Sequence, residues 1–278
     1  MSALRLGSIA PDFQADTTNG PINFHEWIGD SWAILFSHPA DFTPVCTTEL
    51  GEVAKLSEEF QKRNVKAIGL STNDLKDHDQ WVVDINEVSN VDLRFPIIAD
   101  VDRKIAQLYD MLDSEEHDPT NVLDGIPFTI RSVYIIDPNK KIRLTITYPA
   151  SCGRNFDEIL RVVDSLQLTD RSRVVTPANW TPGQEVIVHN SVTREEAEKE
   201  FPGTKNEELP DGGRTEIPFP LSKRDPYPKG FERLPPEMAR PASRPVRESH
   251  RNINLRGYFL SDLSGSTYWC VPSIVSDS

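Results

Sequence analysis

Short apolar runs alternate with amphipathic helical patterns between residues 32 and 168, and this alternation narrows the choice of fold more than any other part of the sequence. The apolar runs predict strands at 32–37 (WAILFS), 65–72 (VKAIGLST) and 95–100 (FPIIAD). The helical patterns predict helices that start at Thr43-Pro44, at residue 74 and near residue 103. Strands that alternate with helices indicate a mixed α/β sheet with helices on both faces.

A hairpin and a final helix close this pattern. Residues 128–137 and 140–149 flank Pro138-Asn139, a spacing that predicts two antiparallel strands. Residues 155–168 carry a strong helical pattern, whereas residues 1–30 are expected to form short strands and turns. The whole arrangement fits a thioredoxin-like α/β fold.

Composition excludes several classes of function. The chain has 278 residues, of which 37% are hydrophobic and 26% charged, as in soluble globular proteins. Its net charge of −13 argues against a nucleic-acid partner or an anionic membrane surface. No apolar run is long enough for an integral membrane segment, and the first residues show no secretory pattern, so a cytoplasmic protein is expected.

The composition changes near Pro210. Of the 22 prolines, ten fall between Pro202 and Pro245, and neither a helical nor a strand period continues there. Such a segment buries too little apolar area to offset its ordering entropy. Residues 211–278 are therefore expected to be a mostly disordered, Pro-rich extension.

Three cysteines, Cys46, Cys152 and Cys270, are widely spaced. Their odd number and the lack of a Cys-x-x-Cys pair predict neither a disulfide framework nor a metal site. Without its context each would be taken as a buried filler, because free cysteine is among the most buried residue types.

The stretch PADFTPVCTTEL changes that interpretation for Cys46. Thr43 is a suitable N-cap and Pro44 a suitable first residue of a helix, which places Cys46 in the first turn. Unpaired amides and the helix dipole stabilise an anion there, so a thiol loses its proton more easily. The location favours a thiolate nucleophile.

Pro39, Thr43 and Cys46 fit the Pro-x-x-x-Thr/Ser-x-x-Cys motif of the peroxiredoxins. The run FSHPADFTPVCTTELG resembles their 1-Cys, peroxiredoxin-6-type branch, as do FPIIAD, YDMLD, YPASCGRNFDEILRVVDSLQLT and TPANWTPGQEVIV in the same order. The resemblance covers roughly residues 5–210. It implies a thioredoxin-like core over 1–176 and an arm over 177–210 that crosses onto the partner subunit of a homodimer.

The resemblance also implies a reaction. Cys46 would attack the O–O bond of hydrogen peroxide or of organic and lipid hydroperoxides and become a sulfenic acid. Thr43 would hydrogen-bond the peroxide, and Arg131 would stabilise the thiolate and the departing oxygen. Pro39 would shield the sulfur from water. An arginine in an apolar strand needs a partner, although an exposed position at the strand end is the alternative for Arg131.

Three more residues match positions of the family. Glu49 and Arg154 would support the active-site arginine, or they would form surface ion pairs of little value. His38 matches a histidine near the pocket, and a structural histidine is an equal interpretation.

No resolving cysteine is expected, because Cys152 lies in a loop and Cys270 in the extension. An external thiol would reduce the sulfenic acid. The resemblance implies glutathione, delivered by a glutathione transferase, with thioredoxin or ascorbate as alternatives and with no prosthetic cofactor or metal.

Some members of this branch are also described as phospholipases A2. His25 and Ser31 match the histidine and serine of that activity, but Asn139 stands where the aspartate is expected. The sequence GDSWA lacks the last glycine of Gly-x-Ser-x-Gly, and Ser31 precedes a strand instead of following one. Structural roles are favoured for all three residues. A chaperone or redox sensor is the alternative function of another class.

Overall fold

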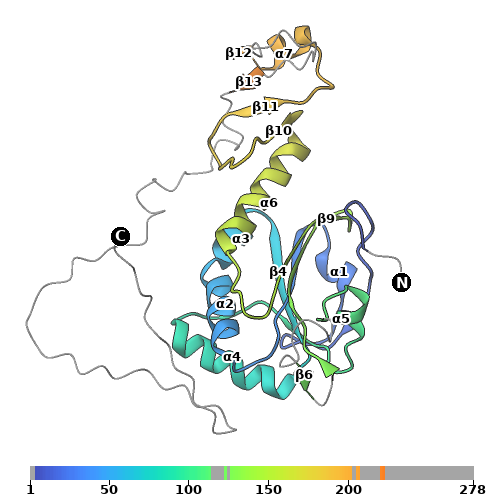
Figure 1. Cartoon of the computed structure of the whole chain (residues 1–278), viewed down its shortest axis with the longest axis vertical. Coiled ribbons are helices and arrows are strands. Elements are labelled where there is room, and N and C mark those ends of the chain that lie inside the picture. Colours follow the sequence, from blue (N-terminus) through green and yellow to red (C-terminus); the bar gives the residue numbers. More distant parts are fainter. Residues whose placement is uncertain (1–3, 114–121, 124–125, 202–204, 207–219, 223–278) are drawn as a thin grey trace, which may run out of the picture. The chain divides into compact units, whose positions relative to one another are not determined.

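The computed structural model describes residues 4–113, 122–123, 126–201, 205–206 and 220–222 (Figure 1). At its centre is a five-stranded sheet in the order β5-β4-β3-β8-β9. Its strands are β3 (Trp32–Ser37), β4 (Val65–Ser71), β5 (Ile97–Ala99), β8 (Arg131–Ile136) and β9 (Ile142–Tyr148). The first three run parallel, β8 pairs antiparallel with β3 and β9 pairs antiparallel with β8, which confirms the predicted α/β class and hairpin.

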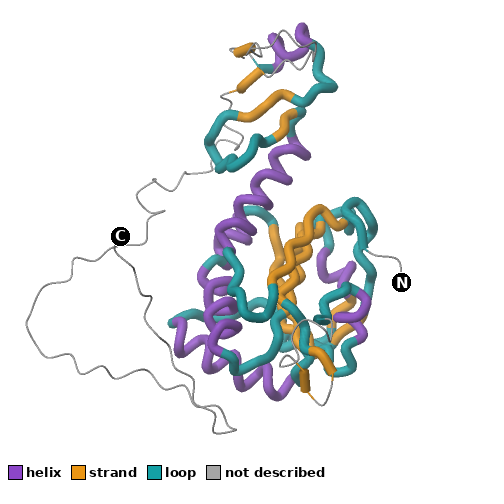
Figure 2. Tube along the Cα trace, in the orientation of Figure 1, coloured by secondary structure: helices purple, strands orange, loops and turns teal. Residues whose placement is uncertain are grey.

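Helices cover both faces of this sheet (Figures 1 and 2). One face carries α2 (Pro44–Lys55), α3 (Ser57–Lys62), α4 (Leu75–Ser89) and α6 (Phe156–Arg171), and the other carries α1 (Phe24–Ile28) and α5 (Lys104–Leu108). The central strand β3 supplies both cores, because successive side chains of a strand point to opposite faces. Ile34 and Phe36 enter the first core, and Ala33 and Leu35 enter the second.

The helices begin where the sequence places their caps. Thr43 is the N-cap of α2, with Pro44 as the first helical residue. The side chain of Asp74 accepts a hydrogen bond from the amide of Asp77 at the start of α4, and Asn155 does the same for Glu158 at the start of α6. The Thr43-Pro44 pair therefore sets the start of α2, which follows β3 after a short loop.

Short elements surround the sheet. Near the N-terminus β1 (Gln14–Ala15) pairs with β2 (Ile22–Asn23), and β6 (Val122–Leu123) pairs with β7 (Ile126–Pro127). The helix α1 was not predicted within 1–30; it forms because Phe24 and Ile28, one turn apart, are both fully buried.

A small C-terminal sheet has the order β10-β11-β13-β12. Its elements are β10 (Val174–Val175), β11 (Val186–Val188), α7 (Arg194–Glu200), β12 (Lys205–Asn206) and β13 (Pro220–Ser222). Trp180 and Phe201 belong to a separate apolar cluster beside it. Strand β13 lies in the segment for which no strand was predicted; the other residues of 211–278, with Cys270, lie outside the described part of the chain.

None of the helices in the described residues is long and apolar enough to cross a bilayer.

Candidate active site

Cys46 lies in the first turn of α2 and is fully buried. The helix follows the central strand β3 through the loop that begins at His38. In this loop Phe42 has a φ of 58°, a left-handed conformation that turns the chain into the helix. The strand–loop–helix connection therefore sets the sulfur at a helix N-terminus, as the sequence predicts.

Arg131, the first residue of β8, reaches this sulfur. Its Nη1 donates hydrogen bonds to Sγ of Cys46 at 3.2 Å and to Oε2 of Glu49 at 2.6 Å. Its Nε donates to the carbonyl of Ala150 at 2.9 Å, and the side chain is 3% exposed. The guanidinium is therefore held from two sides, and the alternative of an exposed arginine at a strand end is excluded.

Glu49 follows Cys46 by almost one helical turn and binds a second arginine, Arg154. The carboxylate accepts from Nε of Arg154 at 3.0 Å, from its Nη2 at 2.7 Å and from its backbone amide at 2.8 Å. Nη1 of Arg154 donates to the carbonyl of Ser37 at 2.7 Å. Both side chains are buried, so they form one internal network with Arg131 and are not surface ion pairs.

Electrostatics keep Glu49 ionised. Burial alone would raise the pKa of its carboxyl, but Arg154 and then Arg131 outweigh burial and hold that pKa below its usual value. Two guanidiniums and one carboxylate therefore form a network that reaches the sulfur through Arg131, and these three side chains carry a net charge of +1.

Thr43 and Pro39 come from the same loop. The hydroxyl of Thr43 donates to the carbonyl of Ala40 at 3.0 Å, so it does not cap the helix with its side chain. The carbonyl of Thr43 accepts from the amide of Thr47 at 3.0 Å. Pro39 is buried between these residues and the end of β3.

His38 is also buried, and it is part of a cluster that the sequence did not predict. Its Nε2 is hydrogen-bonded to Asp41 at 2.8 Å, and the other carboxylate oxygen of Asp41 contacts His78 of α4. The ring of His38 lies 5.0 Å from that of Trp81. The His-x-x-Asp spacing in the loop could have suggested the first pair, but no sequence signal linked it to His78.

The residues that resemble a lipase set have separate partners. His25 contacts the carbonyl of Ala10 at 2.7 Å, and the hydroxyl of Ser31 donates to the side chain of Asn64 at 2.9 Å. Asn139 lies in the turn between β8 and β9. Within the described residues no hydrogen bond joins His25, Ser31 and Asn139.

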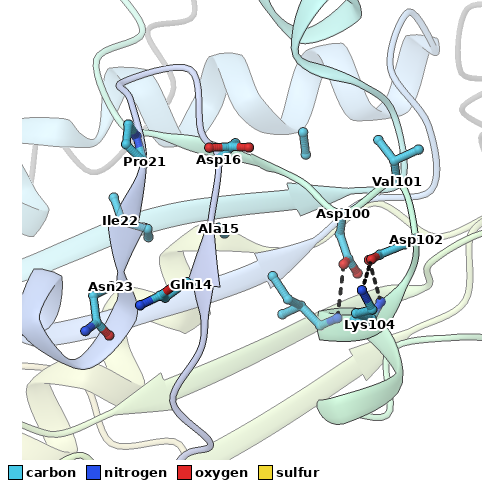
Figure 3. Close-up of a pocket in the computed structure, with 12 residues that line it drawn as sticks. Gln14, Ala15, Asp16, Pro21, Ile22, Asn23, Asp100, Val101, Asp102 and Lys104 are labelled. Atoms are coloured by element: carbon cyan, nitrogen blue, oxygen red, sulfur yellow. Dashed lines mark hydrogen bonds and ion pairs between the residues drawn. The ribbon is translucent and has the colours of Figure 1, made fainter.

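A cavity of about 870 Å³ lies elsewhere, between the β1–β2 hairpin and the start of α5 (Figure 3). Asp100 in its wall accepts from the amides of Ile105 and Ala106, and burial raises the pKa of this carboxyl. Lys104 pairs with Asp102 at 2.5 Å. None of the residues that line this cavity belongs to the network around Cys46.

Cys152 is exposed and lies in the loop after β9. Its thiol lies 3.7 Å from the carbonyl of Gly153 and is not part of the network around Cys46.

The sequence matches two known protein-family profiles. The profile of the AhpC/TSA family matches residues 6–145, and that of the C-terminal domain of 1-Cys peroxiredoxin matches residues 165–204. The first match includes Cys46, Glu49 and Arg131 of the network, and the second includes β10, β11 and α7 of the C-terminal region.

Two curated relatives illustrate the similarity. The mitochondrial peroxiredoxin PRX1 of Saccharomyces cerevisiae is 56% identical over 208 residues, which cover 74% of this chain and 78% of the relative. Human peroxiredoxin-6 is 54% identical over 214 residues, which cover 75% of this chain and 94% of the relative.

Solved structures agree. The peroxiredoxin 6 of Arenicola marina superposes with a TM-score of 0.73 at 46% identity, covering 79% of this chain and 98% of that one. A yeast mitochondrial 1-Cys peroxiredoxin, whose thiol is resolved via glutathione/thioredoxin systems, superposes with a TM-score of 0.70 at 50% identity, covering 79% and 99%. These matches confirm the thioredoxin-like fold.

One prediction is corrected by these relatives. The sequence led us to expect a cytoplasmic protein, but the yeast relative at 56% identity is mitochondrial, which contradicts that assignment. Composition and the lack of a secretory pattern carry no signal that separates the cytoplasm from the mitochondrion.

Both family profiles, the relatives at more than 50% identity and the shared fold lead to one conclusion. Peroxiredoxins need no prosthetic group, since the reaction runs on a cysteine. The chain belongs to the AhpC/TSA family, in its 1-Cys peroxiredoxin branch, and it is a thiol peroxidase.

Proposed function

We propose that Cys46 is the peroxidatic cysteine and reduces hydrogen peroxide and organic or lipid hydroperoxides. The hydrogen bond of 3.2 Å from Arg131 to the sulfur is the observation that carries this proposal. A sulfur that accepts a hydrogen bond from a guanidinium is stabilised as a thiolate, which is the nucleophilic form.

The charge of the whole network supports an ionised sulfur. Arg131, Arg154 and Glu49 together carry +1 in a buried site, and uncompensated charge in such a place is costly. A thiolate on Cys46 brings the total to zero. The amides of the first turn of α2 add their dipoles to the same effect.

In the proposed reaction the thiolate attacks one peroxide oxygen and the O–O bond breaks. Cys46 becomes a sulfenic acid, and the other oxygen leaves as an alkoxide or hydroxide that takes up a proton. Arg131 stabilises the charge that develops on the leaving oxygen.

Thr43 is proposed to orient the peroxide. A hydroxyl has one proton and two lone pairs, and the proton of Thr43 is donated to the carbonyl of Ala40. Its oxygen can therefore accept the O–H of a hydroperoxide. Pro39, buried in the same loop, would exclude water from the sulfur.

An external thiol is proposed to complete the cycle. The glutathione/thioredoxin systems that act on the yeast 1-Cys relative support glutathione as the reductant. The resemblance described in the sequence analysis implies a glutathione transferase as the delivering partner. Because Cys46 is fully buried, the first turn of α2 must open before a thiol can reach the sulfenic acid.

We also propose a homodimer in which the arm over 177–210 lies on the partner subunit. The arm contributes Trp180 and Phe201 to an apolar cluster that also includes Leu168 of α6 and Val174 of β10. Light scattering of the full chain should give twice the monomer mass of 31.4 kDa; a monomer at micromolar concentration would refute this part.

The activity is tested by following peroxide loss with glutathione plus glutathione transferase, and separately with thioredoxin. Cys46→Ser should abolish turnover with either reductant, whereas Cys152→Ser, the matched control, should keep it. A Cys46→Ser protein that still consumes peroxide at the wild-type rate would overturn the assignment.

A further inference from the structure

The cluster of His38, Asp41 and His78 lies beside the site and has no part in the reaction proposed above. It joins the loop after β3 to helix α4, and all three side chains are buried. Its proton content can be worked out from the partners of each ring nitrogen.

His78 has an acceptor on both sides. Its Nε2 lies 3.1 Å from the carbonyl of Ile98, and a carbonyl can only accept, so this nitrogen carries a proton. Its Nδ1 lies 2.5 Å from Oδ2 of Asp41. A second proton therefore lies between His78 and Asp41.

The surroundings of Asp41 decide which of the two holds this proton. Its Oδ1 also receives hydrogen bonds from Nε2 of His38 at 2.8 Å and from the hydroxyl of Ser71 at 3.1 Å. Burial would raise the pKa of Asp41, but the hydrogen bonds from His38 and His78 lower it below its usual value. The carboxylate is thus ionised, and it joins the rings of His38 and His78 through its two oxygens.

His38 then has a defined tautomer. Because Nε2 donates to Asp41, and burial lowers the pKa of this ring, Nδ1 carries a lone pair. That nitrogen is buried and lacks a hydrogen-bond partner within the part of the chain that the structure describes. Buried polar atoms are rarely left unpaired, so such an atom calls for a functional explanation.

The cluster also holds the loop around the sulfur. The amide of Asp41 donates to the side chain of Asn73, and the ring of His38 packs on Trp81. The indole of Trp81 in turn donates to the hydroxyl of Thr47, the residue after Cys46. A displacement of Asp41 would therefore move the loop that carries Pro39 and Thr43.

We infer that Asp41 and His78 are positioning residues of the peroxide site, because His78 anchors Asp41 and, through Asp41, the ring of His38 and the loop over 38–43. The inference rests on the proposed role of Cys46. His78 faces the carboxylate of Asp41 and the carbonyl of Ile98, and the ring of His38 lies 6.4 Å away.

Rapid kinetics test the positioning role. His78→Gln and Asp41→Asn should each slow the oxidation of Cys46 by hydrogen peroxide about 10- to 100-fold, as small misplacements at a reactive centre do. His189→Gln, on an exposed histidine of the C-terminal arm, should keep the wild-type rate. Wild-type rates in both cluster variants would overturn the inference.

Nitrogen NMR of the wild-type protein gives a readout that does not depend on the variants folding. A proton hydrogen-bonded between Nδ1 of His78 and Asp41 should be visible, and His38 should be protonated at Nε2 alone. Absence of that hydrogen-bonded proton would refute the inference even if Cys46 is the peroxidatic residue. Conversely, intact histidine signals in a protein whose Cys46→Ser variant keeps its activity would refute the proposed function instead.

Discussion

Replacing Arg131 by methionine removes the guanidinium that contacts the sulfur and keeps much of the side-chain volume. The wild-type guanidinium lies 3.2 Å from Sγ of Cys46. Two unit charges at that distance attract by about 5 kcal/mol at an effective dielectric constant of 20. Loss of one hydrogen-bond donor to a developing anion raises the activation free energy by about 3–4 kcal/mol, which slows the reaction roughly 10²- to 10³-fold.

The assay is the second-order rate constant for oxidation of Cys46 by hydrogen peroxide, measured before any reductant acts. Arg131→Lys should recover part of the lost rate, because lysine keeps the charge but cannot bind Cys46, Glu49 and Ala150 together. Arg143→Met is the matched control, since Arg143 lies in the neighbouring strand β9 and pairs with Asp170. A rate for Arg131→Met within threefold of wild type would refute the electrostatic reasoning, where threefold is about 0.6 kcal/mol.

Three further outcomes are expected. Glu49→Gln should lower the free energy of unfolding by about 3–5 kcal/mol in urea titrations, because two buried guanidiniums lose their counter-charge; an unchanged midpoint would argue against the network. The pKa of Glu49 is lower in the folded than in the unfolded protein, so its contribution to the free energy of unfolding is present above the unfolded pKa and is lost as pH falls through the folded value. Wild type should therefore lose more stability in acid than Glu49→Gln. Parallel acid profiles of the two proteins would contradict this. Gly51→Ala should lower the free energy of unfolding by about 1–3 kcal/mol, because a methyl group would lie 2.1 Å from the hydroxyl oxygen of Ser89 in α4. Adding Ser89→Gly to this variant should restore the free energy of unfolding. If Gly51→Ala alone leaves stability unchanged, the two helices can separate to make room for the methyl group.

The elements with a strong local signal were predictable. All six residues of β3, five of them apolar, are buried in the structure, and Thr43-Pro44 marked the start of α2 to the residue. The Pro-x-x-x-Thr-x-x-Cys spacing identified Cys46 because it depends on a single loop and one helical turn.

Contacts between distant segments were not predictable from local patterns. The sequence could not decide whether Glu49 and Arg154 were exposed, since both lie at positions where either orientation fits the helix or loop. Glu49 is buried because β8 brings Arg131 beside α2, and Arg131 is 82 residues away from Glu49 in the chain. The same holds for Asp41 and His78, which are 37 residues apart.

Strand pairing in the C-terminal sheet was also not predictable from the sequence. Strand β13 has a proline at its start and no period of its own, and it exists because β11 and β12 supply hydrogen-bonding partners on both sides. Thr43 was placed correctly as an N-cap residue, but its hydroxyl binds Ala40 instead of the helix, a choice that depends on the turn at Phe42.

The account depends on an ionised sulfur in a buried network that is otherwise positively charged. The most direct measurement is the ultraviolet thiolate absorbance of the wild-type protein minus that of Cys46→Ser, compared with the same difference for Arg131→Met. We predict a thiolate band in the wild-type difference and a weaker band in the Arg131→Met difference, because Arg131 donates a hydrogen bond to the sulfur. Equal bands in the two differences, or no band in wild type, would show that Arg131 does not hold a thiolate and would contradict the account.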